Sequence, residues 1–320
     1  MKKYFNQYKI TIIFSLIISL ILVSCTKIIP YKGDITDKKI VANGLIIADS
    51  TISVKLTYSK NYNDNNPFVF VDDANIHLFE NDKNVGSLTY QDSGIYSIDY
   101  VALENQKYKI EITHNDFEEL VSSEFSIPTK IEITNFDPIV YYADDNYSDY
   151  INVDSVFYSF NIQDDKNTEN FYMIKVLLQY HYVDVEVNDA GSIDTIYYNG
   201  FSNTNLRLAD LSLGPAAETL EYPYSGIIFT DEIFNGESIN VKFYSSGKGF
   251  NKGDINKYHV NVYSISKELF LYYSSYNAYQ NSFNPIGNIT SEPVFVYSNV
   301  KNGIGIIGGA SMQKEILTIQ

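Results

Sequence analysis

The chain has 320 residues, with 23 basic and 39 acidic side chains and a formal net charge of -16. Such a charge makes nucleic acid a poor partner, because duplex binding needs a basic surface that displaces counterions. A single cysteine excludes a disulfide framework and a zinc site built from cysteines. An apolar content of 45% is ordinary for a globular chain and excludes disorder of the whole chain.

Residues 1–25 have the pattern of a secretory signal peptide, because three lysines in the first nine residues precede a short apolar run from Ile10 to Val23. That run is shorter than the roughly 20 residues that a helix needs to cross a bilayer. The segment Leu22-Val23-Ser24-Cys25 is similar to a bacterial lipobox, a signal in which the cysteine thiol is acylated and the peptide is cut just before it. We therefore predict that Cys25 is the lipid attachment site and the first residue of the mature chain.

The predicted anchor holds the protein to a membrane without spanning it. One acyl chain binds a bilayer only marginally, and a lipoprotein cysteine carries more than one. Residues 26–37, with Pro30 and Gly33, are predicted to be a flexible tether. Residues 26–30 include no acid, whereas surface-export signals of related lipoproteins are usually acidic there, so the periplasmic and surface faces of the outer membrane both stay open.

Short strands punctuated by turn residues are predicted over residues 38–128. Ile52, Val54 and Leu56 alternate with polar residues, which is the period of a half-buried strand. Repetition of such strands predicts an antiparallel β-sandwich of prealbumin or immunoglobulin-like type. The order of three segments resembles the prealbumin-like sandwiches of carboxypeptidase-regulatory-like and collagen-adhesin B-type domains; these segments are Ala74–Phe79, Asp92–Tyr96 and Lys107–Ile112.

Residues 129–320 are predicted to form a larger β-rich domain with one amphipathic helix near 266–280. Ser266 is the expected N-cap of this helix, and Glu268 lies in its first turn. One helical face is expected to carry the residues Leu269, Tyr272, Tyr273 and Tyr276. The segment 137–154 carries several Tyr and Asp with little apolar periodicity and is predicted to be a long loop.

Four further segments resemble domain-of-unknown-function family 4249, namely Lys39–Gly44, Phe229–Gly236, Ser264–Leu269 and Ser298–Gly305. Members of that family are lipoproteins of Gram-negative bacteria, often encoded beside TonB-dependent outer-membrane receptors. The resemblance implies a TonB-dependent receptor as a candidate partner. The family has no established catalytic residues, so none is transferred to this chain.

Several sequence motifs match those of known functional sites but lack the further residues that those sites require. Residues 303–308 spell G-x-G-x-x-G, but too few residues follow for a dinucleotide-binding crossover, so we predict a buried strand or a close backbone crossing. No two of the residues His77, His114, His181 and His259 have metal-site spacing, and His77 and His181 are expected to face solvent or a neighbouring hydroxyl. We predict neither a metal nor a cofactor.

Two acidic segments admit a second interpretation. Residues 164–170 place oxygen ligands at alternate positions, as calcium loops do, but Lys166 and the missing central glycine favour a solvated hairpin loop. Residues 141–150 mix acids with tyrosines, which can build recognition surfaces.

The sequence thus predicts a membrane-anchored, non-catalytic binding or accessory module of the cell envelope. No nucleophile elbow or S-x-x-K motif is present, and the 39 acids make chance carboxylate pairs inevitable. Three other hypotheses stay open: a cell-surface adhesin or structural subunit, a hydrolase with carboxylates paired in a pocket, and a scaffold facing the periplasm.

Overall fold

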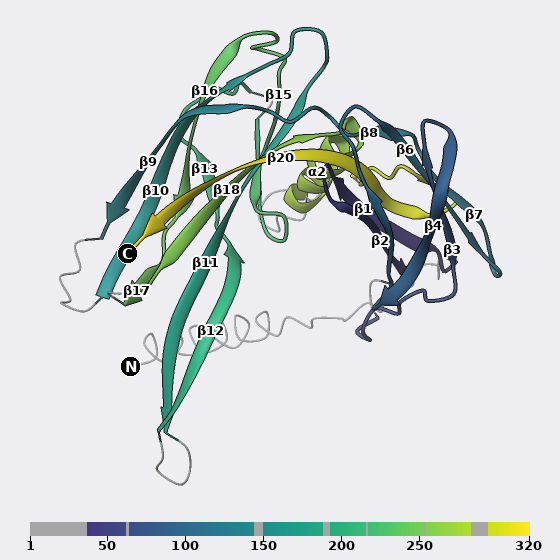
Figure 1. Ribbon diagram of the computed structural model, residues 1–320, viewed down its shortest axis with the longest axis horizontal. Helices are drawn as coiled ribbons and strands as arrows, with labels where there is room; N and C mark the ends of the chain where they lie inside the picture. The colour runs from purple at the N-terminus through teal and green to yellow at the C-terminus, as the bar shows by residue number, and fades with distance from the viewer. Residues whose placement is uncertain are drawn as a thin grey trace, which may run out of the picture. The chain divides into compact units, whose positions relative to one another are not determined.

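The computed structural model describes residues 37–61, 64–143, 150–187, 193–215, 217–251, 254–282 and 294–320. The predicted leader, Cys25 and most of the tether therefore lie outside the described residues. Residues 38–320 form one compact unit. The described residues contain twenty strands and one helix, α2, so the fold is mainly β as predicted (Figure 1). None of the described helical segments has the length and hydrophobicity to cross a membrane.

The N-terminal part is a β-sandwich whose two layers share β4. One layer contains β1 (Ile40–Ile47), β2 (Thr51–Tyr58), β5 (Ile95–Val101) and the second half of β4 (Lys83–Asp92). The other contains the first half of β4, β3 (Asn75–Glu80), β6 (Lys107–His114), β7 (Phe117–Ser122), β8 (Phe125–Ser126) and β19 (Val300–Lys301). Inward-facing residues such as Ile52, Val54 and Leu56 fill the space between the layers, as their alternation predicts.

A second pair of sheets follows in the chain. One sheet contains β9 (Ile133–Tyr142), β10 (Tyr150–Gln163), β13 (Leu206–Leu208), β16 (Ser238–Ser246) and β17 (Gly249–Asn251). The other contains β11 (Phe171–Val187), β12 (Ile193–Asn203), β14 (Glu218–Leu220), β15 (Gly226–Thr230), β18 (Asn256–Ile265) and β20 (Ile304–Ile319). A core rich in aromatic residues lies between them, with Phe243 stacked on Tyr158 at 5.0 Å between ring centroids.

The predicted loop over residues 137–154 is wrong. Residues 133–142 form β9 and residues 150–163 form β10, which pair antiparallel. Most side chains of β9 are exposed or half-buried, so the strand lacks the apolar alternation that identifies a half-buried strand in sequence. Hydrogen bonding to β10 holds it in place. Tyr141 and Tyr142 lie exposed on β9, and residues 144–149 are outside the described residues.

Strand β20, yellow in Figure 1, joins the two parts of the unit. Its first half pairs parallel with β1 and its second half pairs antiparallel with β18. The core of the N-terminal sandwich is therefore made of residues 40–127 together with Val300 and Ile307 from the end of the chain. The division at residue 128 stays a prediction, since β20 joins the β1 layer and the sheet of β11 and β18 into one continuous 15-stranded sheet.

The glycine motif at residues 303–308 lies at this junction, where β20 approaches its neighbours closely. Gly305 has a φ of +125°, and a Cβ atom there would lie 2.1 Å from the carbonyl oxygen of Ala42. At Gly308 a Cβ atom would lie 2.5 Å from Leu269 on α2. The predicted close backbone crossing is confirmed, and its residues serve strand packing.

Helix α2 (Lys267–Ser282) confirms the predicted amphipathic helix. Leu269 and Tyr273 are buried against the sheet of β11, β18 and β20. The Ser266 carbonyl accepts a hydrogen bond from the Phe270 amide, which gives Ser266 the N-cap position. Among the described residues its hydroxyl has no hydrogen-bond partner, so the cap is made by the backbone alone.

Candidate functional site

The segment weighed as a calcium loop is a buried hydrogen-bond network. Asp164 follows β10 and is 5% exposed, and Asp231 follows β15 and is 3% exposed. One carboxylate oxygen of Asp164 accepts hydrogen bonds from the Tyr172 hydroxyl and the Asn170 side chain, and the other accepts one from the Gly236 amide. Asp231 accepts two from Asn170. The structure thus places a loop-to-loop clamp here, and Lys166 takes no part in it.

Burial shifts the pKa values of Asp231 and Tyr172 in this clamp. It raises the pKa of Asp231, and the neighbouring charge of Asp164 raises it further, while the Asn170 amide opposes both effects. Burial and the hydrogen bond to Asp164 raise the pKa of the Tyr172 hydroxyl. The two carboxylates fasten residues 164–170 to residues 231–236.

The histidines of the described residues are dispersed. His77 lies 3.0 Å from the Ser87 hydroxyl, which confirms the expected hydroxyl neighbour. His114 lies 2.9 Å from Asp73, and the side chain of His181 is outside the description. Within the described ranges, no three His, Cys, Asp or Glu side chains come together in a way that could hold a metal ion.

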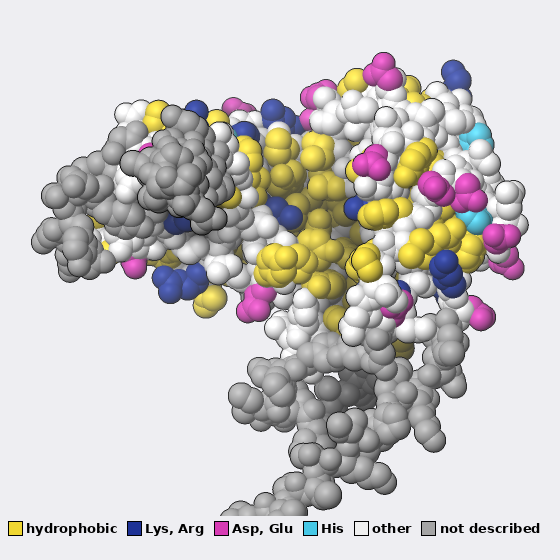
Figure 2. Space-filling model, turned by 90° about the horizontal axis from the view of Figure 1, so that it is seen from below, with side chains coloured by type: hydrophobic (Ala, Val, Ile, Leu, Met, Phe, Trp, Pro, Cys, Tyr) yellow, Lys and Arg dark blue, Asp and Glu magenta, His cyan; other side chains and the backbone are white. Residues whose placement is uncertain are grey.

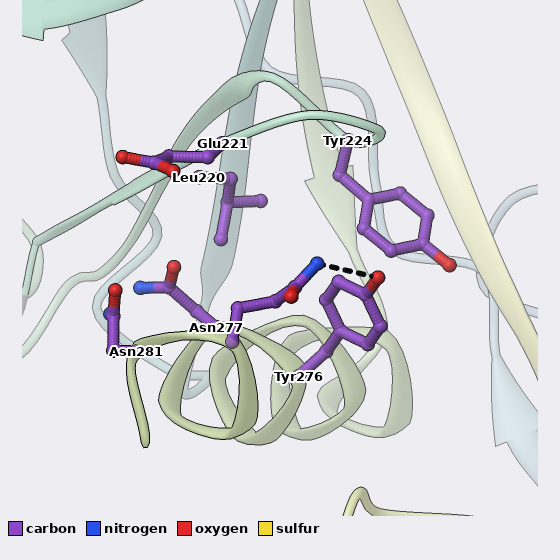
Figure 3. Close-up of a pocket in the computed structure, with 7 residues that line it drawn as sticks. Leu220, Glu221, Tyr224, Tyr276, Asn277 and Asn281 are labelled. Carbon is purple, nitrogen blue, oxygen red and sulfur yellow. Dashed lines mark hydrogen bonds between the residues drawn. The ribbon is translucent and has the colours of Figure 1, made fainter. Parts of the chain in front are cut away.

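A small pocket with two tyrosines in its lining lies between α2 and the turn before β15 (Figure 3). It is lined by Leu220, Glu221, Tyr224, Tyr276, Asn277, Gln280 and Asn281 and has a volume of about 10 Å³. The Gln280 side chain donates to the Tyr276 hydroxyl at 2.8 Å across its wall. Such a volume admits about one water molecule. Its tyrosines dock the helix, together with Glu218, which accepts a hydrogen bond from Asn277.

The sheet face on which α2 packs continues along β11, β18 and β20. Paired residues of neighbouring strands point to the same side of a sheet, and every second residue shares that side. On the side that α2 packs against, Met173 and Tyr263 form one row beneath the helix. The next rows extend past the helix. We call them the open face, whose residues are Lys175, Leu177, Gln179, Phe201, Lys257, His259, Asn261, Lys314, Ile316 and Thr318.

The rows of the open face differ in chemistry. The first pairs Asn261 with Lys175 on one side and Lys314 on the other. The second pairs His259 with Leu177 and with Ile316, whose side chain is 48% exposed. Phe201, 61% exposed, lies at the edge with its ring centroid 5.6 Å from that of His259. Figure 2 shows one face of the molecule on which hydrophobic side chains form a continuous area with a few Lys or Arg side chains among them.

Two hydrogen-bond acceptors of the open face are unsatisfied. His259 and Asn261 are 6% and 5% exposed, and among the described residues His259 Nδ1 and Asn261 Oδ1 have no partner. The other ring nitrogen, His259 Nε2, lies 2.8 Å from the Gln179 side-chain oxygen, so it is the donor of that bond. Burial and the charges of Lys314 and Lys257 lower the pKa of His259. The ring is therefore neutral near pH 7, and its Nδ1 is an acceptor.

The cations of the open face also lack anionic partners within the described chain. Burial lowers the pKa of Lys175, with no carboxylate acting on it. Its Nζ instead lies 5.8 Å from the ring centroids of both Tyr224 and Tyr273. No Asp or Glu belongs to the described rows listed above. An acidic protein thus presents a basic, partly apolar face.

Sequence reasoning did not find this face. Lys175, Asn261 and Lys314 are distant in the chain, and only the register of three strands brings them into one row. The alternation in β18 does predict that His259 and Asn261 share a side, but it does not say which residues lie opposite them.

Comparisons with known proteins agree with the family resemblance. The model of the family described as Domain of unknown function (DUF4249) matches residues 26–316. No curated protein matches the chain. Similar solved structures include collagen adhesin from S. aureus, at 10% identity and a TM-score of 0.21, over 88% of this chain and 94% of that chain.

Two other solved structures are similar at the same low level. One is a proposed membrane-anchored protein from Corynebacterium diphtheriae, at 9% identity and a TM-score of 0.20, over 72% of this chain and 55% of that chain. The other is a proposed carbohydrate-binding protein from Bacteroides uniformis, at 10% identity and a TM-score of 0.16, over 71% and 89%. TM-scores this low carry no conclusion about function. By the match over residues 26–316, the chain belongs to the family Domain of unknown function (DUF4249).

Proposed function

We propose that this protein is a lipid-anchored, non-catalytic binding module of the cell envelope, attached to the outer membrane through Cys25. The observation that carries the proposal is the open face. Helix α2 covers one end of a sheet face, where Lys175 lies near Tyr273 of the helix. The other end carries Phe201, Ile316, Lys257 and Lys314 beside two buried acceptors without a partner among the described residues. Exposed apolar side chains among unpaired polar groups are typical of interaction sites.

The arrangement of the clamp formed by Asp164 and Asp231 favours a binding function over hydrolysis. A carboxylate that acts as acid or base has to reach a substrate atom within hydrogen-bond distance. Both carboxylates of the clamp, Asp164 and Asp231, are buried and bound by Asn170, Tyr172 and the Gly236 amide. They are engaged in holding two loops together.

The predicted lipid anchor and the family resemblance support the accessory role. A lipid anchor followed by a tether keeps a folded domain near the membrane surface, where the effective concentration of a membrane partner is high. The partner that the family resemblance suggests is a TonB-dependent receptor, for which this protein would capture ligand or regulate access.

Affinity capture of the full chain from detergent-solubilised membranes tests the proposal, with the Cys25→Ser variant as the control for anchoring. Co-purification of a large β-barrel receptor in near-stoichiometric amount would support the accessory role. Recovery of the protein alone in several mild detergents would contradict the receptor partnership and favour an adhesin. Hydrolysis of a glycan or peptide library by the purified chain, lost on substitution of Asp164 or Asp231 in a variant that still folds, would contradict the non-catalytic role.

A further inference from the structure

We infer that the open face binds an acidic saccharide, meaning a sugar chain that carries carboxylate or phosphate groups. The inference rests on the proposed binding function and names the ligand class for it. Three independent features of the face each require one property of such a ligand: a negative charge, hydroxyl donors and an apolar ring surface.

The negative charge follows from the lysines. Lys175 and Lys314 lie on either side of Asn261 in one row, and Lys257 lies two residues before His259 on the same side of β18. Lys175 is largely buried without a carboxylate partner, which disfavours its charged form. A ligand carboxylate or phosphate would supply the missing partner by charge-assisted hydrogen bonds.

The hydroxyl groups follow from the unsatisfied acceptors. His259 Nδ1 and Asn261 Oδ1 need donors, and an anion alone offers none. A buried acceptor without a donor is unfavourable, so a ligand that brings a hydroxyl to each of them gains more than one that only neutralises charge. The two side chains are two residues apart on β18 and point to the same side, so hydroxyls of one saccharide can approach both from that side.

The apolar surface follows from Phe201, Leu177 and Ile316, which flank His259 on β12, β11 and β20. The C–H face of a sugar ring packs against such side chains while its hydroxyls and acidic group meet the polar row beside them. A simple carboxylate without hydroxyl groups would pair with the lysines but would bring no donors to the two buried acceptors.

The test is a titration of the purified full chain with tetragalacturonate, followed by calorimetry, with its uncharged methyl ester as the matched ligand. We expect the acid to bind more tightly than the ester and its binding to weaken with added salt. The variant Lys175→Met/Lys314→Met should bind about tenfold more weakly or worse. Lys83→Met, which removes an exposed charge from the N-terminal sandwich, should bind like the unmodified chain.

A second variant separates binding from folding. Asn261→Leu removes a buried acceptor that has no partner within the described chain and keeps a similar volume. We expect its thermal unfolding midpoint to be unchanged or higher and its affinity for tetragalacturonate to be at least about fivefold lower. Unchanged affinity in Asn261→Leu and in the double lysine variant would overturn the inference.

Two further ligands distinguish the sources of acidic sugar. Binding of a phosphorylated lipopolysaccharide core oligosaccharide in preference to tetragalacturonate would assign the face to lipid-linked sugar, and the reverse order would assign it to free polysaccharide. Binding to vesicles of phosphatidylglycerol with neither sugar bound would refute the saccharide inference. Capture of a receptor by a chain that binds neither sugar would refute this inference while leaving the proposed function in place.

Discussion

Asp164 and Asp231 accept hydrogen bonds from one and the same side-chain amide, that of Asn170, at 3.1 and 3.3 Å. Asp164 directly follows β10, and Asp231 directly follows β15. A single asparagine therefore holds together two loops that come from different sheets. The backbone amide of Asn170 adds a third bond, to Asp231. The clamp joins two segments that the sequence analysis singled out. One is residues 164–170, which resemble a calcium loop, and the other is Phe229–Gly236, which resembles the family.

Replacing Asn170 by alanine should destabilise the fold, because both buried carboxylates then lose a donor. We expect the free energy of unfolding to fall by about 1–3 kcal/mol, measured by urea denaturation. Asn167→Ala is the matched control, since Asn167 lies in the same loop but contacts only the exposed Asp165. An equal loss in both variants would contradict the clamp.

The raised pKa of Asp231 predicts a specific pH dependence. The folded chain holds this proton more tightly than the unfolded chain, whose Asp231 has a pKa near the usual 3.8. Its contribution to stability is therefore full below that value and is lost as the pH rises through the raised pKa. Asp231→Asn keeps an acceptor oxygen without the charge, so its stability relative to the unmodified chain should increase as the pH rises from about 4.

Urea denaturation of both chains between about pH 4 and pH 7 measures that difference. A difference in unfolding free energy that is independent of pH would show that Asp231 titrates alike in the folded and unfolded chains. Asp165→Asn is the control for a general effect of removing one negative charge, because Asp165 lies in the same loop and is exposed.

Gly305 and Gly44 lie on adjacent strands and should respond differently to alanine. At Gly305 a methyl group meets the Ala42 carbonyl oxygen at 2.1 Å in a backbone conformation that disfavours side chains. At Gly44 the nearest atom is 3.3 Å away, on the Val54 side chain. We expect Gly305→Ala to lower the free energy of unfolding by more than about 2 kcal/mol and Gly44→Ala by less than about 1 kcal/mol, measured by urea denaturation. Similar values for both variants would contradict the close crossing of β20 and β1.

Phe243 is central to the aromatic core between the second pair of sheets. It is fully buried, with Tyr158 at 5.0 Å and Phe160 at 6.0 Å between ring centroids. Phe243→Ala should cost about 3–5 kcal/mol of unfolding free energy, because it removes the ring and leaves a cavity. The exposed Phe201 is the control, and Phe201→Ala should change stability by less than about 0.5 kcal/mol.

Cys25 is predicted to carry the lipid anchor, and its replacement by serine removes the thiol that would be acylated. Cells that make either chain are labelled with a fatty-acid analogue and fractionated. We expect the unmodified chain to carry label in the membrane fraction and Cys25→Ser to lose both the label and the membrane association. Equal label in the two chains would contradict lipidation at this residue.

The sequence alone determined the mainly β architecture and helix α2 of the described residues. Alternation of Ile52, Val54 and Leu56 locates β2, and the spacing of Leu269 and Tyr273 locates the buried face of α2, because both patterns repeat within a few residues. The same local rule missed β9, whose side chains are mostly exposed and whose place depends on hydrogen bonds to β10.

Only the tertiary structure decided the two clusters on which the chemistry depends. Asn170 meets Asp231, and Lys175 shares a row with Asn261 and Lys314, through strand pairings between distant segments. Side-chain alternation fixes which residues of one strand share a side, but a shift of register by one residue would send the partners to the opposite face. Register is set by packing across the whole sheet, so the open face exists only once β11, β18 and β20 have been brought together.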